Sequence, residues 1–278
     1  MRRATATLVA AGAMMVGLLT AVGPAGATGA APAAPAAPAA APRADGHWNM
    51  QRPFAREVVR RKDRDRDPRH IEHVTELQYR LRWVGAYGGP INGYYNGKVR
   101  DAVKRYQKRV GLHVNGTANH QTWAKLIPQT VKARGKIHRL CKHGIGWHVC
   151  YDRYRHQVTL WKKGKLRNSW LVRGGDRGYE TRTGTFRVFR RDKDHVSSIY
   201  GTPMPFSQFF SGGQAFHGSP FMMDPWQDHS HGCVNMYIED ARQLWSMTHN
   251  VNLNVHINGR WDRTAGPGVG ARGLSIFG

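Results

Sequence analysis

Three side chains near the C-terminal end of the sequence could carry out acyl transfer: Cys233, His217 and His231. The thiolate is the reactive form of cysteine, and a free thiol has a pKa of about 8.5. A neighbouring imidazole can take the thiol proton and hold a thiolate–imidazolium pair. Gly218 and Gly232 flank these side chains, and glycine lets backbone N–H groups come close to a developing oxyanion. The pattern predicts a cysteine nucleophile with a histidine base.

The order of these residues resembles a known family. Residues 217–219 (HGS) followed by residues 230–235 (SHGCVN) resemble the catalytic signature of the L,D-transpeptidases. Residues 183–186 (TGTF) resemble the family's T-G-x-F segment, and residues 201–205 (GTPMP) resemble the stretch before the active-site histidine. The resemblance covers residues 137–258 and implies a mainly β catalytic domain.

The resemblance also implies roles. Cys233 would be the nucleophile, and His217 would be the general base and later the acid. The carbonyl group of Gly218 would hold the imidazole tautomer, the N–H groups of Gly232 and Cys233 would line the oxyanion hole, and His231 would line the site or orient the loop. Further residues expected to complete the motif or contact substrate are Ser230, Asn235, Met204, Phe206 and Trp226. Trp226 is equally compatible with covering the substrate and with packing.

Two positions depart from the family pattern. Members often carry Tyr after Met-Pro, where the hydroxyl group assists the oxyanion, but this chain has Phe206. Either another group substitutes for that hydroxyl, or the oxyanion hole consists of backbone alone. Arg182 stands where members often have Pro, and nothing in the sequence explains it.

The reaction implied by the resemblance needs no cofactor and no metal. Cys233 would attack the carbonyl group of the third residue of a tetrapeptide stem, a diamino acid, and release D-alanine. The side-chain amine of a neighbouring stem would then attack the acyl-enzyme and form a 3→3 cross-link. Carbapenems would inactivate the enzyme by acylating the cysteine.

Three alternatives remain open. The same residues could serve an L,D-carboxypeptidase, in which water is the acceptor. The chain could be a wall-binding protein with a silent catalytic domain, which Phe206 keeps open. It could also be a zinc hydrolase, because His229, His231 and Cys233 alternate and would share one face of a strand. Asp224 and Asp228 lie nearby in the sequence.

A helical unit precedes this region. Apolar residues recur at helical spacing over residues 74–84 and 99–110, and a third short helix is expected over residues 121–127, closed by Pro128. The residues of 71–128 resemble the three-helix peptidoglycan-binding domain, which implies binding to peptidoglycan glycan or stem peptides. Short aromatic and β-branched runs predict strands at residues 147–151, 156–161, 165–172, 185–190 and 251–257, within a region of residues 137–258 that also has one helix over 238–247. The predicted fold class is multidomain α and β: a small three-helix domain followed by a mainly β domain.

The chain has 278 residues and a formal net charge of +24, which favours polyanionic partners. Residues 1–27 are typical of a signal peptide, with two arginines, an apolar stretch and an Ala-Gly-Ala end. Export to the cell wall argues against nucleic acid and leaves anionic wall polymers as partners. Residues 28–70 are expected to be an Ala/Pro-rich and then charged, solvated linker, and residues 259–278 a flexible tail.

The sequence holds three cysteines. An exported chain can form disulfides, and an odd number leaves one thiol unpaired or paired between chains. Cys141 and Cys150 are close enough in sequence to close a short loop. We hypothesise that they are bonded and that Cys233 stays free.

Overall fold

The structure is a computed structural model, and it describes residues 48–133 and 137–261. The predicted signal peptide, the Ala/Pro-rich part of the linker and nearly all of the predicted tail lie outside these residues. No helix in the two described ranges is long and apolar enough to cross a membrane.

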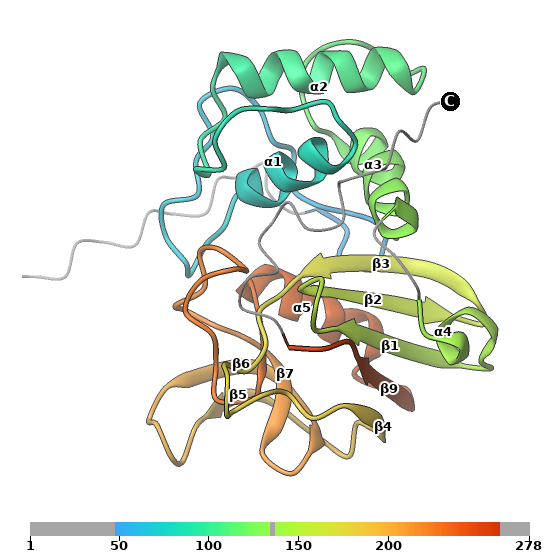
Figure 1. The fold of residues 1–278 in the computed structure, drawn as a ribbon, viewed down its shortest axis with the longest axis vertical. Helices are drawn as coiled ribbons and strands as arrows, with labels where there is room; N and C mark the ends of the chain where they lie inside the picture. The colour runs from blue at the N-terminus through green and yellow to red at the C-terminus, as the bar shows by residue number, and fades with distance from the viewer. Residues whose placement is uncertain (1–47, 134–136, 262–278) are drawn as a thin grey trace, which may run out of the picture. The chain divides into compact units, whose positions relative to one another are not determined.

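The first part of the described chain contains three helices, α1 (Val74–Trp83), α2 (Gly97–Arg109) and α3 (His120–Ala133) (Figure 1). The Asn96 side chain accepts a hydrogen bond from the N–H of Val99 and thereby caps α2. The apolar faces of the three helices share one core, which includes Leu77, Leu81, Val99, Val103, Tyr106, Trp123 and Leu126. The helical half of the predicted fold class is confirmed.

Helix α3 does not end at Pro128, contrary to the expectation from the sequence. Proline removes one backbone donor inside a helix and usually ends or kinks it. Here Thr130 Oγ donates toward the carbonyl groups of Leu126 and Ile127, at 3.0 and 2.8 Å. The helix continues to Ala133, and the turn after the proline faces inward, with Thr130 buried.

The expectation that residues 56–70 are solvated holds for most of their side chains but is wrong for a few that are buried. Arg56 is 1% exposed, and its guanidinium group donates to the carboxylate of Glu76 at 2.8 and 3.1 Å. Asp65 is buried and accepts hydrogen bonds from the N–H groups of Val74 and Thr75, so it caps the first turn of α1. Two of the charges that suggested a solvated linker, Arg56 and Asp65, instead have partners within the fold.

The second part is mainly β, as predicted. A five-stranded sheet has the order β3-β2-β1-β9-β4, in which β1 and β9 are parallel and the other pairs antiparallel. Its strands are β1 (Trp147–Asp152), β2 (Gln157–Lys162), β3 (Lys165–Leu171), β4 (Gly184–Arg187) and β9 (Leu253–Asn258). The short helix α4 (Arg139–His143) precedes β1. The sequence indicated these five strands but not α4.

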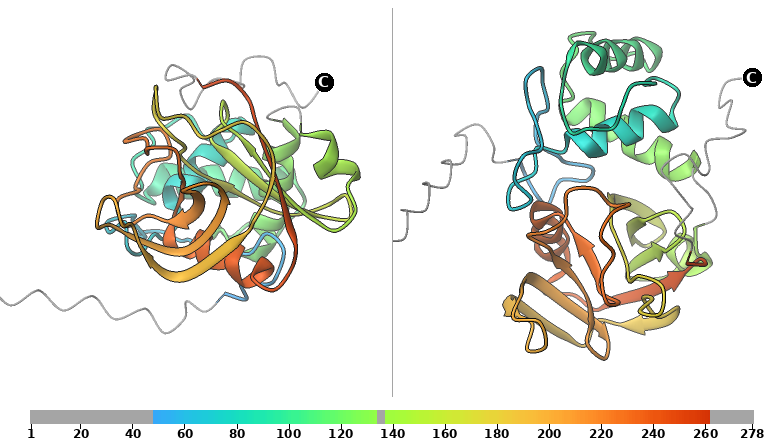
Figure 2. Two further views of the ribbon diagram at one scale, coloured as in Figure 1. Left: turned by 90° about the horizontal axis from the view of Figure 1, so that it is seen from below. Right: turned by 60° about the vertical axis from the view of Figure 1, so that its left-hand side comes forward.

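A four-stranded sheet with the order β5-β6-β7-β8 completes this part (Figures 1 and 2). Its strands are β5 (Arg190–Val196), β6 (Pro203–Ser211), β7 (Gln214–Gly218) and β8 (Val234–Met236), and helix α5 (Ile238–Thr248) follows β8. Side chains of both sheets and of α5 form one core, which includes Val149, Trp170, Phe210, Phe216, Val234, Leu244 and Val255. The second sheet therefore rests on a rigid base, and its two last strands hold the residues of the catalytic signature.

Candidate active site

Strands β7 and β8 bring the predicted nucleophile and base to one face of the second sheet. The two strands are parallel, and His217 lies opposite Asn235. Side chains two residues apart on extended backbone point to the same face. Cys233, two residues before Asn235, packs against a cluster that includes Ala215, two residues before His217. Cys233 and His217 thus lie diagonally across two neighbouring segments, with their side chains on one face.

His217 is oriented as a general base requires. The ring is buried, and Nδ1 lies 2.8 Å from the carbonyl oxygen of Gly218. A carbonyl oxygen can only accept, so Nδ1 carries the proton and Nε2 is left as the proton acceptor. Burial is the main cause that lowers the pKa of His217 to about 4, against the opposing effect of the Gly218 carbonyl. The imidazole is therefore neutral at pH 7.

The thiol of Cys233 is neutral as well. Burial raises its pKa above the ordinary value, and Sγ lies 3.6 Å from the carbonyl oxygen of Gly213. Within residues 48–133 and 137–261, the thiol makes that contact and not one with the imidazole of His217. The thiol is not hydrogen-bonded to the imidazole in this arrangement, whereas the sequence suggested a preformed thiolate–imidazolium pair. The arrangement instead suits transfer of the thiol proton during attack.

The turn before Cys233 is held by one hydroxyl group. Ser230 Oγ donates to the carbonyl oxygen of Cys233 at 2.6 Å and accepts from the N–H of Gly232 at 3.0 Å. The Gly232 N–H, which was expected to face an oxyanion, donates to Ser230 Oγ within the turn in this structure. Gly232 has φ +119°, and a Cβ atom there would lie 2.3 Å from Nε2 of Gln214, so the turn needs glycine.

Arg173 was not identified from the sequence, and it is paired through Asn235 with the predicted base, His217. Its backbone exchanges hydrogen bonds of 3.0 and 2.8 Å with Asn235, and Asn235 lies opposite His217. Arg173 is 4% exposed, and its Nη1 donates to the carbonyl oxygen of Gln227 at 3.0 Å. Its positive charge also lowers the pKa of His217. A charged residue between an apolar strand and a Gly pair was the available signal in the sequence.

Three of the residues expected to contact substrate have different surroundings. Met204 packs in the cluster that includes Cys233 and lies at the site. Phe206 has φ +61° and packs toward the main core, with its ring 6.2 Å from that of Trp245. Trp226 packs on Tyr79 of α1, at 4.4 Å between ring centroids, rather than beside Cys233. Of the two roles considered for Trp226, covering the substrate or packing, this geometry fits packing.

Arg182 now has a local explanation. Its Nη1 donates to the carbonyl oxygen of Ser211 at 2.9 Å, and its backbone N–H donates to Oε1 of Gln214 at 2.9 Å. These bonds join the segment before β4 to the turn between β6 and β7. Gln214 in turn lies over Gly232, so Arg182 supports the turn that holds Cys233.

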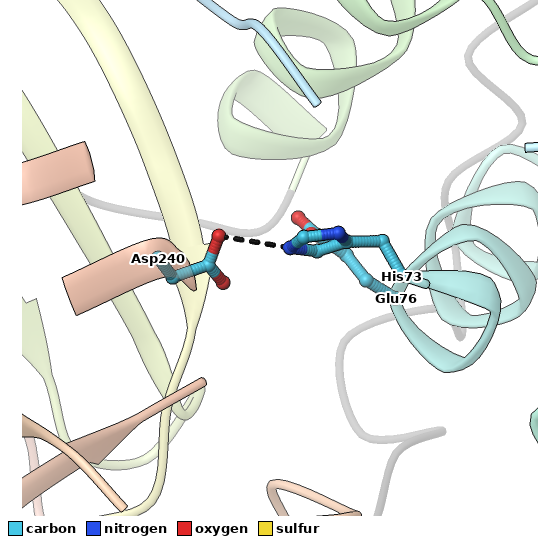
Figure 3. A group of neighbouring side chains, drawn as sticks. All are labelled: His73, Glu76 and Asp240. Atoms are coloured by element: carbon cyan, nitrogen blue, oxygen red, sulfur yellow. Dashed lines mark hydrogen bonds and ion pairs between the residues drawn. The ribbon is translucent and has the colours of Figure 1, made fainter. Parts of the chain in front are cut away.

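The histidines of the zinc alternative do not converge. His231 is exposed and lies between the rings of Tyr179 and Tyr200, at 4.8 and 4.9 Å, whereas His229 packs near His156 at 5.3 Å. Among the residues that the structure describes, donor atoms suited to a metal gather elsewhere, at His73, Glu76 and Asp240 (Figure 3).

This second cluster is an ion-pair network. Nε2 of His73 lies 3.1 Å from Asp240, and the guanidinium groups of Arg56 and Arg80 lie 2.8 and 2.7 Å from Glu76. All five side chains are buried. Two arginines already neutralise the carboxylates, and they would repel a further cation.

A disulfide joins Cys141 of α4 to Cys150 of β1, with the Cα atoms 6.5 Å apart. This is the pair hypothesised from the sequence. Cys233 is the remaining free cysteine of the chain's three.

Comparison with protein families matches both parts of the chain. Residues 146–257 match the model of the L,D-transpeptidase catalytic domain, and residues 71–126 match that of a putative peptidoglycan-binding domain. Both resemblances stated from the sequence are confirmed.

Curated relatives match over a short stretch. The spore cortex-lytic enzyme of Oceanobacillus iheyensis is 36% identical over 56 residues, which are 20% of this chain and 20% of the relative. That of Halalkalibacterium halodurans is 33% identical over 73 residues, 26% of this chain and 22% of the relative. The chain thus spans about a fifth of the length of these relatives.

Solved structures with similarity include two L,D-transpeptidases. The one from Stackebrandtia nassauensis is 26% identical with a TM-score of 0.47, and the match covers 70% of this chain and 94% of that chain. The one from Xylanimonas cellulosilytica is 24% identical with a TM-score of 0.42, over 73% of this chain and 98% of that chain.

Proposed function

The chain carries an L,D-transpeptidase catalytic domain after a peptidoglycan-binding domain, and from this premise we propose that it forms 3→3 cross-links in peptidoglycan through an acyl-enzyme on Cys233. One observation carries the proposal. The single free thiol lies on the same sheet face as a buried, neutral imidazole whose Nε2 is available as a proton acceptor.

The proposed reaction starts from the neutral pair. Sγ of Cys233 bonds to the carbonyl carbon of the third stem residue while its proton passes to Nε2 of His217. The tetrahedral intermediate collapses, and the amine of the departing D-alanine takes that proton. The amine of a second stem then attacks the thioester, His217 accepts the amine proton, and the proton returns to the released thiolate. The backbone N–H of Cys233 remains as a donor for the oxyanion, because Gly232 and Phe206 supply none there.

The proposed partners follow from the two domains and the charge. Stem peptides would occupy the catalytic face, and glycan or stem peptides would bind the helical domain. The formal charge of +24 supports additional binding to anionic wall polymers, and nucleic acid is not an expected partner after export. Residues 1–27 support secretion to the cell wall. Carbapenems, which carry a strained acyl group, are proposed to acylate Cys233.

Mass spectrometry of products from a disaccharide-tetrapeptide tests the proposal, with Cys233→Ala as the matched control. The expected product is a dimer whose mass equals that of two monomers minus one molecule of D-alanine. One amide bond is exchanged for another, so no water is consumed or released. The variant should form no such dimer. A tripeptide without dimer would instead identify an L,D-carboxypeptidase. An identical product from wild type and Cys233→Ala would contradict catalysis by this cysteine.

A further inference from the structure

The loop of residues 219–232 connects the strand of His217 to Cys233, and one side of this loop is held by helix α1. The hydroxyl group of Tyr79 donates to the carboxylate of Asp224, with oxygen–oxygen distances of 3.0 and 2.9 Å. Oδ1 of Asp224 also accepts the backbone N–H of Trp226 at 2.9 Å. The tyrosine therefore binds the same carboxylate that shapes the middle of the loop.

Aromatic rings strengthen this contact. Trp226 of the loop lies 4.4 Å from Tyr79 and 6.0 Å from Trp83 of α1, measured between ring centroids. Tyr79 and Trp83 are 2% and 4% exposed and stack at 5.8 Å. Leu171 at the end of β3 belongs to the same cluster. We call Tyr79, Trp83, Asp224 and Trp226 the α1 clasp.

The same loop is fastened at two more places. Arg173, in the row of Asn235 and His217, binds the carbonyl group of Gln227. Met222 packs with Ile71, which precedes α1. Since both ends of the loop lead directly to His217 and Cys233, a shift of the loop would move the thiol relative to the imidazole.

We propose that the helical domain completes the active site, with Tyr79 and Trp83 as positioning residues that set the distance between Cys233 and His217 through the α1 clasp. The inference rests on the proposed function for its catalytic consequence. Misplacement of reacting groups by about 1 Å can lower a rate by about 100-fold. The helical domain would then serve catalysis on soluble stem fragments as well as binding to the wall.

Tyr79→Phe and Asp224→Asn in the full chain test the proposal, because each keeps the size of the side chain and weakens the bond. Tyr106→Phe is the matched control, since the Tyr106 hydroxyl donates to Gln129 inside the same helical domain. With a soluble disaccharide-tetrapeptide, kcat should fall about tenfold or more in both clasp variants, with little change in KM, and less than about twofold in the control. The double variant should fall no further than either single one.

Alkylation of Cys233 by iodoacetamide gives a readout that needs no substrate. A loosened loop should expose the thiol and raise the alkylation rate severalfold in the clasp variants, with no change in Tyr106→Phe. Unchanged alkylation and unchanged kcat in both clasp variants, at a melting temperature equal to that of the wild type, would overturn the inference. An inactive wild type whose clasp variants still alkylate faster would contradict the proposed function and leave the positioning role supported.

Discussion

Two neutral groups, a thiol and an imidazole, face the substrate side of the second sheet. Burial moves the two pKa values in opposite directions, upward for Cys233 and downward for His217. A thiol of this kind is protected from indiscriminate oxidation, because the thiolate is the form that oxidants attack. We expect its activation to require that the thiol and Nε2 of His217 come together when substrate binds.

The pH dependence of the reaction follows from the base. The folded pKa of His217 is about 4, below the ordinary value of 6.5, so the ring stays unprotonated as the pH falls from 7 toward about 4. We expect kcat/KM to stay level over that range and to decline only as the pH falls through about 4. A stopped assay over pH 3–8 with buffers of constant ionic strength measures this. A midpoint near 6.5 would contradict the buried, neutral base.

Arg173 supplies part of that shift. Burial is the larger cause, and the positive charge of Arg173 adds to it. Arg173→Gln removes the charge and keeps a polar side chain of similar flexibility, so the pKa of His217 should rise. The acid limb of the kcat/KM profile should therefore move to higher pH. Arg155→Gln is a suitable control, because Arg155 pairs with Asp152 at the far end of β1. An unmoved limb in Arg173→Gln would show that this charge does not act on the base.

At the scale of single residues, the reactive side chains could be predicted from the sequence, but the hydrogen bonds around them could not. The cysteine, the histidine and the Gly218 carbonyl could be named because each stands in a short, ordered motif. The use of the Gly232 N–H by Ser230 could not, because it depends on the φ angle of the turn. Arg173 could not either, because its role comes from a pairing with a residue 62 positions later in the chain.

Among the elements, the turn between the loop of residues 219–232 and β8 is expected to tolerate substitution least. Alanine at position 232 would have to adopt φ +119° and displace Gln214, whose amide binds Arg182 and Glu180. We expect Gly232→Ala to lower kcat by at least tenfold and to cost about 1–3 kcal/mol of unfolding free energy. Gly111→Ala is the control, since Gly111 has φ +67° after α2 but open space around it. Activity assays and urea denaturation of both variants measure the difference.

Equal losses of activity in the two glycine variants would mean that backbone strain alone explains the effect. Loss confined to Gly232→Ala, with Gly111→Ala affected only in stability, would support a turn shaped for the nucleophile. The second outcome is the expected one.

The elements that could be predicted were those with a regular apolar pattern. Strands β1, β2 and β9 and helix α5 carry such patterns and lie within a residue or two of the expected ranges. Strand β5, with the sequence RRDKDHV, has too few apolar residues to signal a strand, because it is a charged strand at the sheet edge. Helix α3 passes Pro128 and buries Thr130 beyond it, so the local proline signal did not mark the end of the helix.

For the whole molecule, stability depends on the buried ion-pair network of Arg56, His73, Glu76, Arg80 and Asp240. Glu76→Gln would leave two buried guanidinium groups without their shared carboxylate. We expect a loss of about 3–5 kcal/mol of unfolding free energy, because breaking a buried ion pair strands an uncompensated charge. Asp101→Asn, which removes an exposed pair with Arg100, should cost at most about 1 kcal/mol. Chemical denaturation of both variants provides the measurement, and equal losses would contradict the network's role.

The disulfide between Cys141 and Cys150 bears on how the protein can be made. Three cysteines can pair in three ways, and in two of them Cys233 is consumed as a partner. A chain that is oxidised before it folds would sample all three isomers, and two of them would be inactive although their mass equals that of the native isomer. Production routes that form the disulfide once the chain has folded, when Cys141 and Cys150 are adjacent and Cys233 lies in the active site, should therefore yield a higher specific activity per milligram. Titration of one free thiol per molecule, followed by peptide mapping of the bonded pair, would serve as the quality criterion for each batch.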